Sequence, residues 1–155
     1  MSLALRVVVP AEIDALIPIL QDADEDVGRI RTLLTDGMHT SYAIFDGESL
    51  IGATTLRWAE DESEIEYIAV VSGLRGRGYG KAIIAALLEE ARQRGVNSLL
   101  VGTANSSLDT IAFYQKCGFR MDSVRHDFFS YVQPPITENG IPMRDMLVLR
   151  YDLKY

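Results

Sequence analysis

A glycine-rich stretch, Gly73–Lys81, has the composition of an anion-binding loop. It reads G-L-R-G-R-G-Y-G-K and places four glycines and three cations within nine residues. It lies between a strand-like run and a helix-like run, so the first N–H groups of that helix lack intrahelical partners. The exposed backbone, the helix dipole and the cationic side chains favour an anion, and a pyrophosphate is the best match. The alternative is a glycine-rich turn whose charges are only solvated.

The spacing within this stretch excludes two common nucleotide-binding motifs. A Walker A loop continues from Gly-Lys to Ser or Thr, but the residue after Lys81 is alanine. The dinucleotide fingerprint G-x-G-x-x-G also fails, because the same lysine occupies its third glycine position. The pattern that remains is Arg75-x-x-Gly78-x-Gly80, so we do not expect a nucleotide-binding switch.

Two carboxylates, Glu64 and Glu66, lie two residues apart on the strand-like run before the glycines. Side chains alternate along a strand, so both are expected on one face, together with Ile68 and Val70. A carboxylate beside another negative charge is a stronger base, which suits proton abstraction. The alternative is a strand edge with both side chains in solvent. Glu66 lies nearer the glycine-rich stretch and is the favoured base.

A second motif, A-F-Y-Q-K-C-G-F at Ala112–Phe119, follows after room for one helix and one strand. Together with Arg75-x-x-Gly78-x-Gly80 it resembles the GNAT superfamily of acetyl-CoA-dependent N-acetyltransferases. The resemblance covers most of the chain, and the segment Asn139–Met146 is similar to the tail of a bacterial subgroup. It implies an acyltransferase that moves the acetyl group of acetyl-CoA to a primary amine. The acceptor would be a small molecule or a peptide, attacking directly in a ternary complex.

The resemblance also implies which residues contact acetyl-CoA. In the family the loop amides hold the pyrophosphate, and the N–H of the residue corresponding to Val70 binds the oxyanion. The family often places Asn seven residues before the helix tyrosine. That position is Ser107 here, with Asn105 two residues earlier; either contacts the pantetheine arm, or Ser107 only caps the helix. The implied coenzyme-binding residues are Ala69, Val70, Arg75, Gly76, Arg77, Gly78, Tyr79, Gly80, Lys81, Asn105 and Ser107.

Tyr114 is the residue for which the resemblance implies the clearest catalytic role. It places the phenol beside the coenzyme sulfur, where the hydroxyl can protonate the departing thiolate; the alternative is an aromatic packing anchor. The family's strand glutamate deprotonates the amine, often through water, which assigns Glu66 first and Glu64 second. Alkylamines have a pKa of about 10.4, so a base or a desolvated pocket is needed.

Composition limits the other functions that the chain can have. Its 155 residues are 48% hydrophobic and 24% charged, which is typical of a single globular domain spanning 1–155. A net charge of -7 argues against nucleic-acid or anionic-membrane partners. The single cysteine, Cys117, and the absence of a signal-like N-terminus predict a cytoplasmic location. His39 and His126 lack the spacing of a metal site, so no metal is expected.

Periodicity predicts the elements that position these residues. Strands are expected at 5–9, 41–45, 49–58, 64–71, 97–103, 119–128 and 146–153, and helices at 11–21, 26–34, 79–94 and 107–116. This order indicates an α/β (α+β) fold. The resemblance specifies a mixed, mostly antiparallel sheet of about seven strands flanked by about four helices. The stiff segment 133–142, with three prolines, either covers the site or pairs with a partner.

The acceptor amine is the least determined part. Acidic clusters at 22–26 and 60–66 flank the acceptor side of the family's fold and would attract a cation such as a polyamine, an amino sugar or a lysine-bearing peptide. The stretch D-A-D-E-D at 22–26 is itself expected to be a solvated turn. The aromatic residues expected to line an acceptor pocket are Trp58, Tyr67, Phe128, Phe129 and Tyr131. The alternative function is a non-catalytic acyl-CoA-binding sensor, and the sequence leaves a homodimer open.

Overall fold

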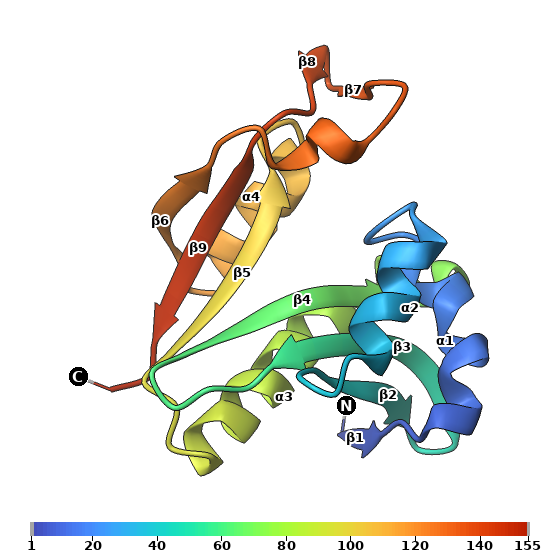
Figure 1. Ribbon diagram of the computed structural model, residues 1–155. Coiled ribbons are helices and arrows are strands. Elements are labelled where there is room, and N and C mark those ends of the chain that lie inside the picture. Colours follow the sequence, from blue (N-terminus) through green and yellow to red (C-terminus); the bar gives the residue numbers. More distant parts are fainter. Residues whose placement is uncertain (1, 155) are drawn as a thin grey trace.

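A mixed sheet runs through the molecule, with helices on both of its faces (Figure 1). The computed structural model describes residues 2–154. Its strands are β1 (Leu3–Val7), β2 (Thr40–Asp46), β3 (Ser49–Arg57), β4 (Glu62–Val70), β5 (Ser98–Ala104), β6 (Arg120–Arg125), β7 (Thr137–Glu138), β8 (Ile141–Pro142) and β9 (Met146–Asp152). Its α-helices are α1 (Ile13–Leu20), α2 (Val27–Thr35), α3 (Tyr79–Gln93) and α4 (Leu108–Lys116).

Within residues 2–154, seven strands pair in the order β1-β2-β3-β4-β5-β9-β6. Neighbours are antiparallel, except that β4 and β5 run parallel. The predicted mixed, mostly antiparallel sheet with four flanking helices is therefore confirmed.

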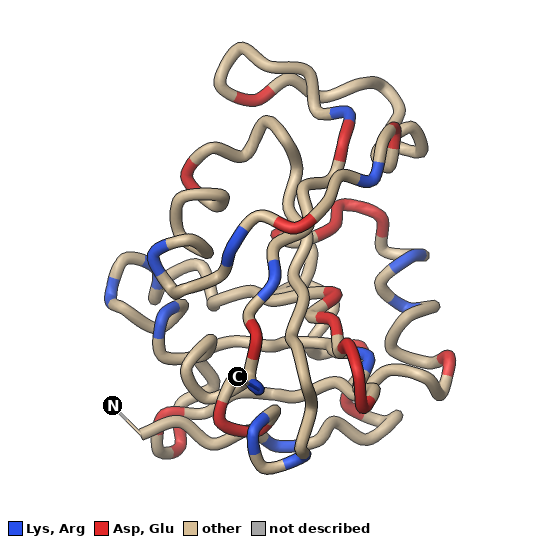
Figure 2. Tube along the Cα trace, turned by 90° about the vertical axis from the view of Figure 1, so that its left-hand side faces the viewer, with Lys and Arg blue, Asp and Glu red and all other residues tan. Residues whose placement is uncertain are grey.

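In the view of Figure 2, basic and acidic residues are interspersed along the chain. No helix in residues 2–154 has the length and apolar character needed to cross a membrane.

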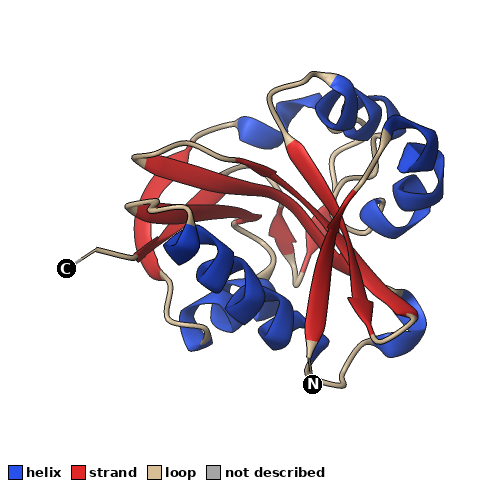
Figure 3. Cartoon of the chain, turned by 90° about the horizontal axis from the view of Figure 1, so that it is seen from below, coloured by secondary structure: helices blue, strands red, loops and turns tan. Residues whose placement is uncertain are grey.

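Each face of the sheet has its own core (Figure 3). On one face, α3 and α4 bury residues such as Ile83 and Tyr114 against Ile44 of β2. On the opposite face, α1 and α2 bury residues such as Leu20 and Ile30 against the neighbouring Ala43. Adjacent residues of β2 thus face different cores, as strand alternation requires.

The parallel strands β4 and β5 separate halfway along their length (Figure 1). Their pairing ends at Ile65 opposite Val101. On the other side of β4, Ile65 and Tyr67 pair with adjacent residues of β3, so Glu66 is an extra residue in the strand. A bulge of this kind bends a strand and changes the direction of its side chains.

The bulge corrects the predicted facing of β4. Ile68 and Val70 pack against the α3–α4 core, whereas Tyr67 packs against the α1–α2 core. Glu66 lies on the α1–α2 side, where it borders the same hollow as α2. Glu64 faces that side too, because its neighbour in the strand is buried in the α3–α4 core. The expectation that all four even-numbered residues share a face is therefore wrong beyond the bulge.

Two predictions near the end of the chain need correction. The strand expected at 119–128 stops at Arg125, and residues Phe128–Tyr131 form a 3-10 turn instead. The proline-rich segment 133–142 contains the small hairpin of β7 and β8, which the sequence did not predict.

Candidate active site

The glycine-rich stretch forms the connection from β4 to α3. Gly76 and Gly78 have φ angles of 77° and 84°, a left-handed backbone that other residues adopt only at a cost. Gly78 is the N-cap of α3, and the N–H of Ala82 donates to its carbonyl. Among residues 2–154, the backbone N–H groups from Gly76 to Lys81 have no acceptor. The start of α3 is therefore a row of free donors that suits an anion.

The side chains of this connection have separate partners. Arg75 forms an exposed ion pair with Asp22 of the α1–α2 loop. The hydroxyl of Tyr79 donates to Asp46 at the end of β2, at 2.9 Å. Gly80 allows α3 to approach α4, since a Cβ there would lie 3.3 Å from the Phe113 ring. Two exposed cations complete the connection: Arg77 and Lys81.

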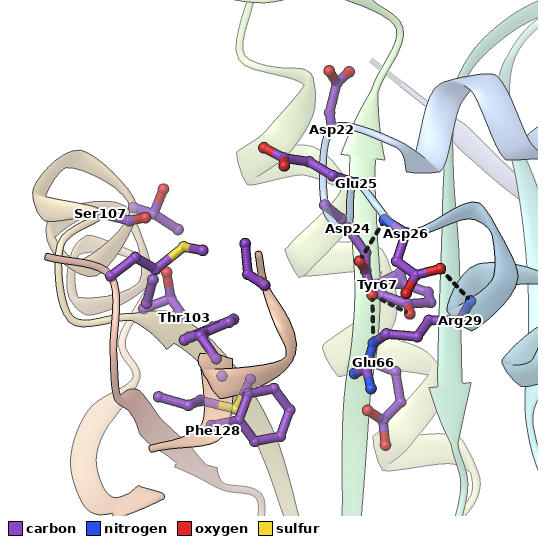
Figure 4. A pocket seen from close by; sticks show the side chains of 18 of the residues that line it. Asp22, Asp24, Glu25, Asp26, Arg29, Glu66, Tyr67, Thr103, Ser107 and Phe128 are labelled. Carbon is purple, nitrogen blue, oxygen red and sulfur yellow. Dashed lines mark hydrogen bonds and ion pairs between the residues drawn. The ribbon is translucent and has the colours of Figure 1, made fainter. Parts of the chain in front are cut away.

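A cavity of about 660 Å³ opens where β4 and β5 separate. Its walls come from β4, β5, the α1–α2 loop and the segment that precedes β9. In Figure 4, the acidic loop and Glu66 lie on one wall, and Thr103 and Phe128 lie on the facing wall. The glycine-rich connection does not line the cavity but continues directly from the β4 wall.

The end of β4 presents backbone donors to the gap. The N–H of Val71 donates to the carbonyl of Ile51 at 2.9 Å, so that residue faces β3. Backbone groups alternate in direction along a strand. The N–H groups of Ile68 and Val70 therefore point toward the β5 side, where pairing has already ended.

Tyr114 of α4 lines the cavity and belongs to a buried cluster of aromatic rings. Its side chain is 4% exposed and packs edge-on against Phe113 and Phe119. The residue lines the cavity, and its hydroxyl is not among the fully buried polar atoms of residues 2–154 that lack a hydrogen-bond partner. Burial, with the nearby Cys117 thiol, raises the pKa of the phenol. Tyr114 is thus both a packing anchor and a protonated hydroxyl beside the cavity.

The two carboxylates of β4 have different environments. Glu64 is buried and accepts two bonds from the guanidinium of Arg125, at 2.6 and 2.9 Å. Glu66 is half-buried and lines the cavity. Burial, and next the negative charge of Glu64, raise the pKa of Glu66 above its ordinary value of 4.5, while His39 and Arg125 oppose the rise. Glu66 therefore borders the cavity as a carboxylate of raised pKa, whereas Glu64 is engaged in an ion pair.

The sequence matches the acetyltransferase (GNAT) family over residues 10–119. The chain belongs to the GNAT family. It is therefore an acetyltransferase. The strands β4 and β5, whose pairing ends halfway along their length, are neighbours within its seven-stranded sheet.

Relatives and solved structures agree with this membership. The uncharacterized N-acetyltransferase YvbK of Bacillus subtilis is 39% identical over 114 residues, covering 72% of this chain and 74% of the relative. A Bacillus subtilis acetyltransferase solved in complex with CoA superposes with a TM-score of 0.84 at 34% identity, covering 97% of this chain and 100% of the other. A GNAT acetyltransferase of Elizabethkingia anophelis with acetyl-CoA bound gives 0.82 at 29% identity, covering 97% of each chain.

In this GNAT chain, Asn105 and Ser107 form hydrogen bonds to residues 138–145, the segment that precedes β9. The side-chain oxygen of Asn105 accepts from the N–H groups of Arg144 and Asp145, at 2.9 and 3.0 Å. Ser107 is the N-cap residue of α4, but its hydroxyl donates to Glu138 at 2.9 Å and makes no side-chain cap bond. Ser107 still lines the cavity, whereas Asn105 does not.

The acidic α1–α2 loop is an exposed turn, as expected, at every position of 22–26 except Asp24. Asp24 is 8% exposed and accepts bonds from Arg29 at 3.0 Å and from the hydroxyl of Tyr67 at 2.8 Å. Asp26 caps α2 by accepting from a backbone N–H. Glu25 is exposed and has no ion pair within residues 2–154. The loop therefore holds α2 against β4 and leaves Glu25 open to the cavity (Figure 4).

Most of the predicted aromatic residues do line the cavity. Tyr67, Phe128, Phe129 and Tyr131 contribute to its walls. Trp58 does not, because it lies in the α3–α4 core region and donates to the hydroxyl of Tyr42 at 3.0 Å. Arg29, which sequence reasoning missed, stacks over Tyr131 at 4.0 Å. The sequence held no signal for that contact.

His39 is the other residue that sequence reasoning missed. No group of three potential metal ligands occurs within residues 2–154, and the two histidines lie in different surroundings. His126 is exposed, whereas the side chain of His39 is 7% exposed and approaches Glu66. No spacing rule connects positions 39 and 66, so only the folded chain reveals their contact.

Proposed function

We propose that this acetyltransferase transfers the acetyl group of acetyl-CoA to a primary amine, by direct attack in a ternary complex. The observation that carries the proposal is the row of free N–H groups from Gly76 to Lys81, continuous with the gap between β4 and β5. The solved relatives with coenzyme bound support it. When bound, acetyl-CoA supplies an activated acetyl thioester.

The binding roles follow from the position of each group. The free amides, with Arg75, Arg77 and Lys81, hold the diphosphate. The main chain of Ala69 and Val70 borders the thioester, and the N–H of Val70 donates to the oxygen that gains negative charge. Of the two candidates for the pantetheine arm, we favour Ser107 over Asn105, because only Ser107 borders the cavity.

We assign the proton-transfer roles to two titratable side chains that line the cavity, Glu66 and Tyr114. Glu66 removes a proton from the incoming ammonium group, directly or through water, since its raised pKa makes it a better base than an ordinary carboxylate. Tyr114 remains protonated because burial raises its pKa, and its hydroxyl donates to the departing sulfur. Glu64 is the weaker candidate for the base, because Arg125 occupies both of its oxygens.

We further propose a cationic amine acceptor, such as a polyamine, an amino sugar or a lysine-bearing peptide. Glu25, Glu66 and Glu138 contribute negative charge to the cavity, and Phe128 and Tyr131 add aromatic surface that suits a cation. Arg29 also lines the cavity, and its positive charge is compensated by its ion pair with Asp24.

The single cysteine, Cys117, is free, which fits a reducing cytoplasm.

Calorimetry and a thiol-release assay test the proposal. Coenzyme A and acetyl-CoA should each bind the folded protein, and acetyl-CoA with an amine panel should release free thiol fastest for cationic amines. Absence of binding heat with both forms of the coenzyme would contradict the diphosphate site. Binding without turnover on any amine would contradict the proposed reaction and favour a coenzyme sensor.

A further inference from the structure

A buried histidine lies behind the proposed base. His39 sits between α2 and β2, and its Nδ1 lies 2.7 Å from the Oδ2 of Asp36. Its Nε2 faces Glu66, 3.5 Å from Oε1. Within residues 2–154, this Nε2 is the one fully buried side-chain nitrogen or oxygen without a hydrogen-bond partner. A buried polar atom without a partner is unusual and calls for a functional explanation.

The other charged groups around Glu66 are already committed. Glu64, on the same strand, is bound through both oxygens to Arg125 of β6. From α2 and the preceding loop, Arg29 is bound to a buried aspartate, and Asp26 accepts from a backbone N–H. The ring of His39 is therefore the polar group of the described residues that is free to act on Glu66.

Asp36 fixes the ring in that orientation. Its carboxylate accepts from Nδ1 of His39 and from the N–H groups of Met38 and His39, at 2.7, 2.8 and 3.2 Å. Partial burial raises the pKa of Asp36, but these bonds outweigh it and lower the pKa overall. An ionised Asp36 holds Nδ1–H, so a ring protonated on both nitrogens directs Nε2–H at Glu66.

We infer that Asp36 and His39 form a positioning pair for Glu66: the pair orients the carboxylate toward the cavity and keeps it ionised until the acceptor arrives. The catalytic use of this pair rests on the proposed role of Glu66 as base. A separation of 3.5 Å is long for a hydrogen bond, but catalytic contacts often tighten only when substrate binds.

The sign of the effect follows from the groups that face Glu66. Burial and the charge of Glu64 raise the pKa of Glu66, and His39 acts against them. Removing the imidazole removes one of the groups that lower the pKa of Glu66, so this pKa should rise further. The carboxyl should then hold its proton to a higher pH, and less of the base form should exist at a given pH below the new midpoint.

The first test follows the Glu66 carboxyl by ¹³C NMR titration in the coenzyme-free protein, with the resonance assigned from its loss in Glu66→Gln. In His39→Asn, the amide nitrogen replaces Nδ1 and still binds Asp36, but nothing faces Glu66. The midpoint should rise by roughly one pH unit, the lower end of the range for a nearby charge. His39→Gln places a neutral donor near the Nε2 position and should give an intermediate midpoint.

His126→Asn is the matched control, because it makes the same substitution at the exposed histidine. It should leave the midpoint of Glu66 unchanged. Equal midpoints in wild type and in His39→Asn would overturn the inference, as would an equal rise in the His126 variant.

The second test separates this inference from the proposed function. In His39→Asn, the acidic limb of the kcat/KM profile should move to higher pH by the amount seen in the NMR titration, with a plateau within about two-fold of wild type. In a Glu66→Gln background the same substitution should have no further effect. Unchanged kinetics in Glu66→Gln alone would reject Glu66 as base, while the NMR titration still decides whether His39 acts on its carboxyl.

Discussion

At the scale of single residues, Glu66 and Tyr114 differ in their packing: Tyr114 is buried, whereas Glu66 is half-buried. Tyr114 is packed edge-on between the rings of Phe113 and Phe119. Glu66 sits at a strand bulge beside another carboxylate. Burial and the charge of Glu64 raise the pKa of Glu66, and a carboxylate perturbed in this way is costly to folding and is typical of functional sites.

Tyr114→Phe should lower kcat by about 100- to 1000-fold, the lower part of the range that general acid catalysis supplies. The ring keeps its packing against Phe113 and Phe119, so the melting temperature should hardly change. Turnover at saturating substrates and a thermal unfolding curve provide the measurement. Near-normal turnover would leave Tyr114 with its packing role alone.

Glu66→Gln should reduce activity and increase stability at neutral pH. The pKa of Glu66 is raised in the folded protein above its ordinary 4.5, so the folded state binds the proton more tightly than the unfolded state. The ionised carboxylate therefore costs stability at neutral pH, and this cost disappears as the pH falls below the ordinary value. Denaturation at pH 8 should show a more stable variant, and the difference should shrink toward pH 3. A variant less stable than wild type at pH 8 would show that the carboxylate is well compensated.

At the scale of elements, the sequence predicted what depends on neighbours in the chain. Helical spacing located α3, with Gly78 before it and Gly95 after it. The bulge at Glu66 was not predictable, because it depends on how β4 pairs with β3. Asp24 and His39 were misread for the same reason: their partners, Tyr67 and Glu66, lie far along the chain.

The two ends of α3 allow a matched pair of substitutions. Gly78 and Gly95 both have positive φ, at 84° and 73°, and a Cβ at either would meet no atom within 4 Å. Replacing either by valine should destabilise the protein by about 1–2 kcal/mol through backbone strain. Only the Gly78 side chain would stand before the free donors, so only that variant should weaken coenzyme A binding, by ~10-fold or more (~1.4 kcal/mol).

Calorimetry with coenzyme A, beside a denaturant unfolding curve for each variant, separates the two effects. Equal loss of affinity in both variants would mean that strain in α3, rather than blocked donors, weakens binding.

At the scale of the whole molecule, the net charge of -7 and the acidic side of the cavity act on the approach of the acceptor. A cation is attracted from a distance set by salt, since the Debye length falls from ~10 Å at 0.1 M to ~3 Å at 1 M. Coenzyme A is an anion and is proposed to bind at the cationic glycine-rich connection, so its own salt response must be removed by working at saturating acetyl-CoA.

For a diamine acceptor at saturating acetyl-CoA, kcat/KM should therefore fall several-fold as salt rises over that range, and it should fall more steeply than for a monoamine of similar length. Glu25→Gln removes an exposed carboxylate of the cavity wall that has no ion pair in residues 2–154, so it should reduce the preference for the diamine at low salt and leave kcat unchanged. Initial rates across a salt series, for both amines and both proteins, provide the measurement. A preference for neutral or anionic amines, or salt curves of equal slope for the two amines, would mean that shape rather than charge selects the acceptor.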